Sequence, residues 1–296
     1  MSIASVNGIE IFYETTGSPS GTPLLLLSGL GMQLTGWPPE WRDGLAVADH
    51  YVICHDNRDV GLSSHFPDVG TPDLGAIFEG SDPNVTYLLA DMADDAAGLL
   101  DHLGVERAHV VGISMGGMIA QELAIRHPER LLSLCSMMST TGDPGVGQPS
   151  PPAVAALIAS SPLTREESME AAVAMSAIIG SPAYPSDPEV DRERAGAAFD
   201  RCSDPDGVAR HLGAVLMSPD RTLGLGAVTV PTLVIHGDSD PLVNPSGGEA
   251  TAKAIPGAEL LIVEGMGHDL PVQLNRRLIG AVVAHAASVD TAGLFG

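Results

Sequence analysis

A serine between two glycines opens the search for chemistry in this chain. Residues Gly112-Ile113-Ser114-Met115-Gly116 have the pattern G-x-S-x-G. The apolar run at 108–111 predicts a strand ending at the serine, and residues 115–126 predict a helix that Pro128 ends. Such a turn lifts a serine hydroxyl above the sheet edge, while the glycines leave room for close neighbours. The pattern predicts that Ser114 is a nucleophile.

A serine hydroxyl needs a base to accept its proton, and the base needs a carboxylate that orients it. Residues 230–236 and 259–263 are predicted to be strands, each followed by a polar turn. The first turn contains Asp238 and Asp240, and the second places His268 in a glycine-rich loop. The order serine, acid, histidine is typical of this kind of serine turn. On spacing alone, either aspartate could orient the histidine.

Strands alternate with helices from residue 24 onward, which predicts an α/β fold with a mostly parallel sheet covered on both faces. The remaining expected strands are residues 9–14, 24–27, 51–54 and 131–136. The first is expected to be antiparallel, at the sheet edge. Residues 90–103 and 271–285 are expected to be helices, with Asp94 and Asp95 on a solvated or capping face.

The pattern changes between residues 141 and 222. Proline, glycine, serine and aspartate separate alanine-rich helical runs near 151–160, 165–179, 187–201 and 206–217, and no strand is expected. A loop of about 80 residues without structure of its own would be unusual. We predict a helical cap at 141–222, inserted into a core formed by 1–140 and 223–296. Such a cap would cover the serine, exclude water and shape the pocket.

The chain resembles the α/β-hydrolase superfamily, in its serine esterase branch. The motifs that carry this resemblance are the serine turn, Ser28-Gly29-Leu30-Gly31, the D-x-R-x-x-G-x-S turn at 56–63, the acid turn at 237–240 and Gly267-His268. It extends from the first strand to the last helix and is weaker over 142–223. Within the superfamily the chain is most similar to aclacinomycin methylesterase-type actinobacterial esterases. That similarity rests on Gly36-Trp37-Pro38, Asn57-Arg58-Asp59 and Gly265-Met266-Gly267-His268.

The resemblance implies an eight-stranded sheet and a catalytic triad of Ser114, His268 and Asp240. It also implies an oxyanion hole formed by the backbone N–H groups of Leu30 and Met115, the second of which lies at a helix start. Ser28 stands where the family usually has a histidine. How the oxyanion loop is anchored is therefore left open. The turn at 56–63 is expected to be structural, its arginine pairing with nearby carboxylates.

Six of the eleven methionines lie near the predicted site in the sequence. Soft, unbranched side chains suit an adaptable apolar pocket, although they fill cores equally well. The predicted pocket residues are Gly29, Met32, Trp37, Met137, Met138 and Met266. They indicate an uncharged, mostly apolar acyl group.

The chain has a formal net charge of −23, which argues against nucleic acid and anionic membranes as partners. Its three cysteines have neither metal-site spacing nor the number for a disulfide framework, and no phosphate-binding loop is present. We therefore expect no metal and no cofactor. No signal-peptide pattern and no long apolar run is visible, so the cytoplasm is the expected location. The oligomeric state is left open.

The expected activity is hydrolysis of small to medium uncharged carboxylic esters through an acyl-enzyme. The same triad could instead serve a lactonase, a thioesterase, a carbon–carbon bond hydrolase, a perhydrolase or an acyltransferase. A serine argues against haloalkane dehalogenases and epoxide hydrolases, whose relatives of this family place an aspartate there. A non-catalytic small-molecule binder on the same scaffold is the alternative from another functional class.

Overall fold

An eight-stranded sheet forms the centre of the computed structural model, which describes residues 2–79, 83–159 and 162–292. The strand order is β1-β2-β4-β3-β5-β6-β7-β8. The strands are β1 (Ser2–Val6), β2 (Ile9–Thr16), β3 (Thr22–Leu27), β4 (His50–His55), β5 (Ala108–Ile113), β6 (Leu131–Met137), β7 (Thr232–Gly237) and β8 (Glu259–Val263). From β4 to β8 all neighbours are parallel, whereas β2 pairs antiparallel with both β1 and β4.

The antiparallel direction of β2 was predicted correctly, but its place at the sheet edge was wrong. The outer position belongs to β1, which pairs with β2 through a turn at Asn7 and Gly8. Both turn residues have positive φ, at 48° and 81°. An Asn-Gly pair adopts such angles at low cost and joins two strands into a tight hairpin.

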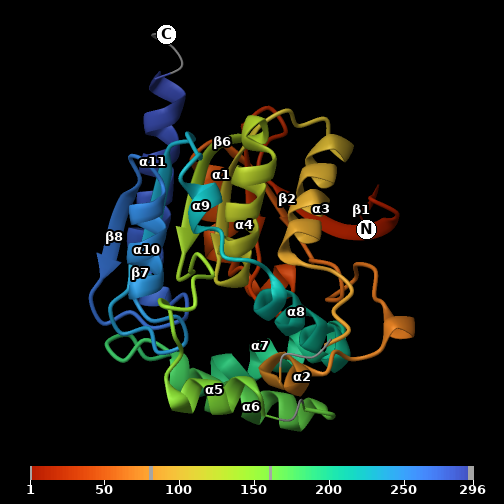
Figure 1. The fold of residues 1–296 in the computed structure, drawn as a ribbon. Coiled ribbons are helices and arrows are strands. Elements are labelled where there is room, and N and C mark those ends of the chain that lie inside the picture. The colour runs from red at the N-terminus through yellow and green to blue at the C-terminus, as the bar shows by residue number, and fades with distance from the viewer. Residues whose placement is uncertain (1, 80–82, 160–161, 293–296) are drawn as a thin grey trace.

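Two layers of helices cover the sheet (Figure 1). On one face α3 (Leu89–His102), α4 (Met115–Arg126) and α9 (Thr222–Leu225) pack together, and on the other α1 (Pro39–Val47) packs against α11 (Asn275–Ala292). Strand β3 contributes to the core on both faces of the sheet. Leu25 and Leu27 pack in the core with α3 and α4, whereas Leu24 and Leu26 pack in the core with α1 and α11. Helix α10 (Ser246–Ala254) packs against β7 and β8.

Four helices follow β6: α5 (Pro151–Leu157), α6 (Arg165–Ile179), α7 (Pro188–Arg201) and α8 (Pro205–Met217). We call them the inserted helices. Each begins after a residue whose side chain accepts a backbone N–H of the first turn: Ser150, Thr164, Asp187 and Asp204. In Figure 1 they lie beyond the carboxyl ends of the central strands. Within the described part of 141–222, no strand is formed.

The remaining short elements are α2 (Leu74–Glu79), which packs against α8, and four 3₁₀ helices. The 3₁₀ helices span Leu34–Gly36, Pro67–Val69, Pro128–Arg130 and Val272–Leu274. Among the residues that the structure describes, no helix is both long enough and apolar enough to cross a lipid bilayer.

Candidate active site

Ser114 lies in the turn between β5 and α4 with φ 53° and ψ −121°, a conformation that non-glycine residues rarely adopt. The surrounding structure holds it there, because its N–H donates to the Met137 carbonyl at 2.9 Å and its own carbonyl accepts from Ser139 Oγ at 2.9 Å. A Cβ on Gly112 would collide with the carbonyl of Gly116. The glycines therefore permit the close approach of helix and strand that the sequence predicted.

The structure brings His268 and Asp240 to this serine from two different loops. His268 Nε2 lies 2.9 Å from Ser114 Oγ, and His268 Nδ1 lies 2.7 Å from Asp240 Oδ2. The other carboxylate oxygen accepts the N–H groups of Leu242 and Val243, both at 2.9 Å. The acid is thus held by its own turn while it holds the histidine, which is the arrangement of a nucleophile, a base and an orienting acid.

The second aspartate of the acid turn has another partner. Asp238 is exposed, and its Oδ1 accepts the N–H of Gly265 at 2.7 Å. The side chain of Asp240 is fully buried, and it is this carboxylate that contacts His268. Between the two candidates that spacing leaves open, the geometry therefore favours Asp240 as the orienting acid.

Asp240 remains ionised despite its burial. Burial alone would raise its pKa, but the charge of His268 and hydrogen bonds from His236, His268 and the Val243 N–H outweigh it, and the pKa falls to about 2. His236 is fully buried, with Nε2 at 2.8 Å from the Val243 carbonyl and 3.4 Å from Asp240 Oδ2. It is hydrogen-bonded within the fold and supports the acid turn.

The end of α6 and the residues that follow it hold the loop that carries His268. The Ile179 carbonyl accepts the His268 N–H at 2.7 Å, and Ser181 Oγ accepts the Gly267 N–H at 2.8 Å. The Ser181 hydroxyl in turn donates to the carboxylate of Asp269. Burial raises the pKa of Asp269, although Ser181 and His268 act in the opposite direction. Asp269 is thus tied to the inserted segment, and no sequence pattern indicates this contact.

We expect Ser181→Ala to lower kcat about tenfold, because a small displacement of a catalytic group is costly and the histidine loop would lose a buried acceptor. Ser181→Thr keeps the hydroxyl and serves as the control. The measurement is steady-state ester hydrolysis together with urea unfolding. Equal kcat values for the alanine variant and the wild type would show that this contact does not position His268.

Two residues beside the serine, Leu30 and Met115, are candidates to supply backbone N–H donors. Among the described residues, the N–H groups of Leu30 and Met115 donate no hydrogen bond. Met115 opens helix α4, where the helix dipole favours negative charge. The loop of Leu30 lies against the serine, since a Cβ on Gly29 would be 3.5 Å from Ser114 Cβ. Both residues thus lie near Ser114, and neither N–H has a protein acceptor among the described residues.

His211 anchors the loop at residues 28–31, in which Ser28 stands where the family usually has a histidine. Its Nδ1 accepts the Gly31 N–H at 3.2 Å, and its Nε2–H donates to the Arg58 carbonyl at 2.6 Å. Asp56 adds a second anchor by accepting the Leu34 N–H at 2.7 Å. Sequence reasoning missed His211, because it lies on α8, far along the chain and in no recognisable motif.

Burial lowers the pKa of His211 from 6.5 to about 4. Between pH 6.5 and about 4, His211 is protonated in the unfolded chain but neutral in the folded protein. The stabilisation is therefore complete above pH 6.5 and is lost as the pH falls towards 4, by about 3 kcal/mol in total. In urea unfolding at pH 7 and pH 4.5, His211→Gln should lose about 2 kcal/mol less stability than the wild type. Equal losses would contradict this account.

A cavity of about 540 Å³ opens above the serine. Ser114 and His268 line it together with three of the predicted pocket residues, Gly29, Met32 and Met138. The inserted helices supply Leu157, Met175, Ile179, Val190 and Arg194, and the histidine loop supplies Asp269 and Leu270. The lining is largely apolar, but the residues from the inserted helices could not be predicted without knowing how those helices dock.

The prediction was wrong for the other three pocket residues. Trp37, Met137 and Met266 are fully buried in the core cluster beneath α1 and α11, and they do not line the cavity. Trp37 packs against Trp41, with ring centroids 5.5 Å apart. Proximity in sequence to the catalytic turns misled the prediction, since neighbouring residues on a strand or turn point to opposite sides.

The turn at 56–63 is structural, as expected: Arg58 pairs with Asp95 at 2.7 Å. The expectation for Asp95 was wrong, because this carboxylate is buried beneath that arginine, whereas Asp94 is partly exposed beside Arg126. A buried carboxylate is tolerated where a charged partner is fixed against it.

One group of described residues has the spacing of metal ligands. Donor atoms of Asp59, His65 and Asp204 lie within 4.8 Å of one another. Arg210 already occupies both carboxylates, at 2.8 Å from Asp59 and 3.4 Å from Asp204. The group is best described as a charge network centred on this arginine.

The chain is similar to known proteins over most of its length. Residues 22–162 match the family model of the alpha/beta hydrolase fold, and residues 217–277 match a model described as TAP-like protein. The chain is 31% identical to rhodomycin D methylesterase DauP of Streptomyces sp. (strain C5), over 94% of this chain and 95% of that protein. It is 30% identical to a 2-hydroxy-6-oxononadienedioate/2-hydroxy-6-oxononatrienedioate hydrolase of Paraburkholderia phymatum, over 88% and 85%.

Among solved structures, the enol-lactonase of Burkholderia xenovorans LB400 superposes with a TM-score of 0.76 at 24% identity, covering 97% of this chain and all of that one. That likeness shows the shared fold. The identity to DauP over nearly the whole of both chains shows the family. This chain therefore belongs to the α/β-hydrolase family and is a hydrolase.

Proposed function

We propose that the protein is a serine carboxylic-ester hydrolase that acts on small to medium uncharged esters through an acyl-enzyme. The observation that carries this proposal is the hydrogen-bonded series from Asp240 through His268 to Ser114 at the floor of the cavity. A series of this kind generates an alkoxide-like nucleophile at neutral pH without a cofactor.

In the first half-reaction Ser114 Oγ attacks the ester carbonyl while His268 Nε2 takes its proton. The carboxylate of Asp240 keeps the proton on Nδ1 and stabilises the imidazolium. The N–H groups of Leu30 and Met115 bind the oxyanion as it develops. His268 then gives its proton to the departing alcohol, and the acyl group stays on the serine. Water, activated by the same histidine, releases the acid in the second half-reaction.

The cavity supports an uncharged acyl group. Most of its wall is aliphatic, and the inserted helices cover it from the side opposite the sheet. Burial of an apolar acyl chain favours binding by about 25 cal/mol per Å² of buried surface. Exclusion of bulk water also strengthens the hydrogen bonds that stabilise the oxyanion.

The names of the relatives suggest two reactions for this chain. A methylesterase such as DauP releases methanol from an ester, and the Paraburkholderia enzyme is named as a hydrolase of an oxo-dienedioate. The greater coverage of DauP favours the ester for this chain. Carbon–carbon bond hydrolysis, which the same nucleophile and base could serve, is the second candidate.

The test is hydrolysis of p-nitrophenyl esters from acetate to laurate, with Ser114→Ala measured in parallel. Serine-dependent turnover would support the esterase, and the chain-length optimum would report the depth of the acyl pocket. A folded protein that turns over none of these esters but cleaves a lactone or a vinylogous diketone would replace the ester proposal with one of its alternatives.

A further inference from the structure

A second histidine lies beside the acid of the proposed triad. His236 stands near the end of β7, and its Nε2 lies 3.4 Å from Asp240 Oδ2, the same carboxylate oxygen that His268 Nδ1 contacts at 2.7 Å. The side chains of His236 and Asp240 are both fully buried. One carboxylate oxygen therefore lies between two imidazole rings, of which the proposed reaction uses only one.

The surroundings of His236 decide which ring nitrogen carries the proton. Nε2 lies 2.8 Å from the Val243 carbonyl oxygen and 3.4 Å from the carboxylate, and both of these groups can only accept a hydrogen bond. The proton of the neutral ring must therefore be on Nε2, where it donates to the Val243 carbonyl and lies near Asp240 Oδ2. Nδ1 is left as a buried acceptor, and it has no donor among the described residues.

Through this one N–H group His236 acts on both oxygens of the acid. Val243 donates its own N–H to Asp240 Oδ1 at 2.9 Å while its carbonyl accepts from His236, so the ring fixes the residue that fixes Oδ1. Oδ2 lies beside the N–H group itself. Helix α10 closes the set from behind, because a Cβ on Gly248 would be only 2.4 Å from His236 Nδ1.

A histidine at this position is not explained by packing alone. A buried acceptor without a donor is unfavourable, and an aliphatic side chain of similar size would avoid it. What the imidazole adds is the N–H group at Nε2. His236 does not belong to the described lining of the catalytic cavity, so any effect that it has on the reaction passes through Asp240.

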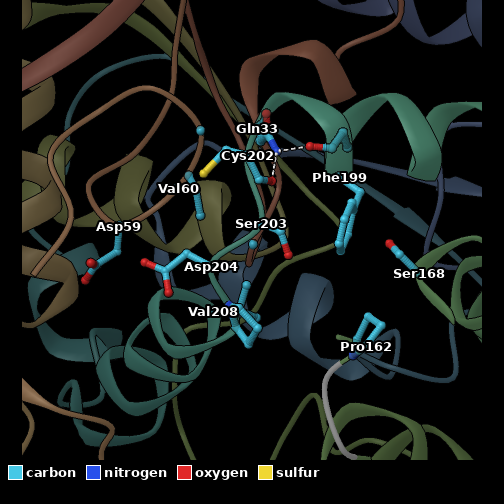
Figure 2. Close-up of a pocket in the computed structure, with 14 residues that line it drawn as sticks. Gln33, Asp59, Val60, Pro162, Ser168, Phe199, Cys202, Ser203, Asp204 and Val208 are labelled. Atoms are coloured by element: carbon cyan, nitrogen blue, oxygen red, sulfur yellow. Dashed lines mark hydrogen bonds between the residues drawn. The ribbon is translucent and has the colours of Figure 1, made fainter. Parts of the chain in front are cut away.

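Contact between a histidine and a carboxylate does not by itself make a base. Asp204, which lines the cavity of about 210 Å³ in Figure 2, has Oδ2 at 2.6 Å from His65 Nδ1. The other nitrogen of His65 faces the Gly61 carbonyl at 3.1 Å, so each of its nitrogens has an acceptor-only oxygen beside it. At His268, Nε2 instead faces the Ser114 hydroxyl. The orientation of that ring, and of the carboxylate that holds it, is therefore what the reaction needs.

We propose that His236 is a positioning residue of the ester-hydrolysis site, whose Nε2–H group holds the Asp240 carboxylate in the orientation that binds His268 Nδ1. The effect on rate rests on the proposed function, whereas the arrangement of protons does not. Without this N–H group the carboxylate would be held mainly at Oδ1, by the N–H groups of Leu242 and Val243. Oδ2, the oxygen that orients His268, would then be free to turn.

Two conservative replacements separate the N–H group from the bulk of the ring. In His236→Gln the side-chain amide reaches the place of Nε2 and can donate to the Val243 carbonyl, whereas in His236→Asn it ends near the place of Nδ1 and cannot. For a p-nitrophenyl ester, we expect His236→Asn to lower kcat about tenfold with KM unchanged, and His236→Gln to stay within about threefold of the wild type. Urea unfolding checks that each variant is folded.

A third variant moves the ring without replacing it. Gly248→Ala adds a Cβ that would meet His236 Nδ1, so it should displace the imidazole and lower kcat as His236→Asn does. The matched control is Gly280→Ala in α11, where an added Cβ has no neighbour within 4 Å and kcat should stay at the wild-type value. This pair carries the test even if the asparagine variant does not fold.

Nitrogen-15 NMR of histidine-labelled protein reads the arrangement without any substrate. In the wild type, His236 should have a protonated Nε2 and an unprotonated Nδ1. The proton on His268 Nδ1 should give a low-field signal that moves in His236→Asn and Gly248→Ala but stays in place in His236→Gln and Gly280→Ala.

A proton on His236 Nδ1 in the wild type would overturn the proposal. So would folded His236→Asn and Gly248→Ala variants that leave both kcat and the His268 signal unchanged, since His236 would then only fill space. If the signals behave as expected but no ester is cleaved, the proposed ester hydrolysis fails while the positioning role of His236 stands.

Discussion

Replacing Ser114 by alanine is expected to lower kcat for ester hydrolysis by roughly 10⁴- to 10⁶-fold, as loss of a triad nucleophile does. The hydroxyl is the atom that would bond to the acyl group, and it is the atom that His268 contacts at 2.9 Å. No neighbouring side chain in the described cavity offers a second hydroxyl to the same base. Single-turnover and steady-state hydrolysis of a p-nitrophenyl ester measure the loss.

The fold of this variant should be unchanged, because the backbone bonds to Met137 and Ser139 hold the turn without the hydroxyl. Ser20→Ala, at an exposed position far from the site, is the matched control and should keep wild-type activity. Binding of a product carboxylic acid, followed by calorimetry, should survive in Ser114→Ala. An alanine variant that retains comparable turnover would remove Ser114 from the mechanism.

Asp240→Asn is expected to lower kcat about 10⁴-fold, while Asp238→Asn changes it less than about threefold. The asparagine would present an N–H₂ group or a weaker acceptor to Nδ1, and His268 would lose both its tautomer and the charge that stabilises its imidazolium. Asp238 contacts the Gly265 N–H and lies in solvent, so its amide should be tolerated. The two variants are isosteric and differ only in position.

The comparison is made by kcat over a pH range, with urea unfolding as a check on folding. Asp240 has a pKa lowered to about 2, so its contribution to stability is complete above pH 3.8 and is lost as the pH falls towards 2. The asparagine variant should lack this loss. If Asp238→Asn proved the more damaging change, the orienting acid would have to be reassigned to Asp238.

The residues that sequence placed correctly share a local cause. The serine turn, the two polar turns and most strands follow from composition within ten residues, and the serine geometry follows from glycines beside it. Strand β1 could have been found the same way, because Asn7-Gly8 between two apolar runs is a strong hairpin signal that was not used. Local patterns thus predicted most core strands, the serine turn and the two polar turns that follow strands.

What sequence could not supply depends on contacts between distant segments. His211 reaches Gly31 across 180 residues, and Ser181 reaches Gly267 across 86. No periodicity encodes such pairs, because they arise only when the inserted helices dock. Asp95 is a further example. Its polarity predicts exposure, but Arg58, which is distant in the sequence, covers it in the fold.

The hydrogen bonds between the end of α6 and the histidine loop couple the positions of these two segments. Ile179 and Ser181 grip the backbone on either side of the junction between Gly267 and His268. Any swing of that end of α6 away from the sheet would draw the imidazole off the serine. Proton transfer from Ser114 therefore depends on the end of α6 keeping its place beside the histidine loop.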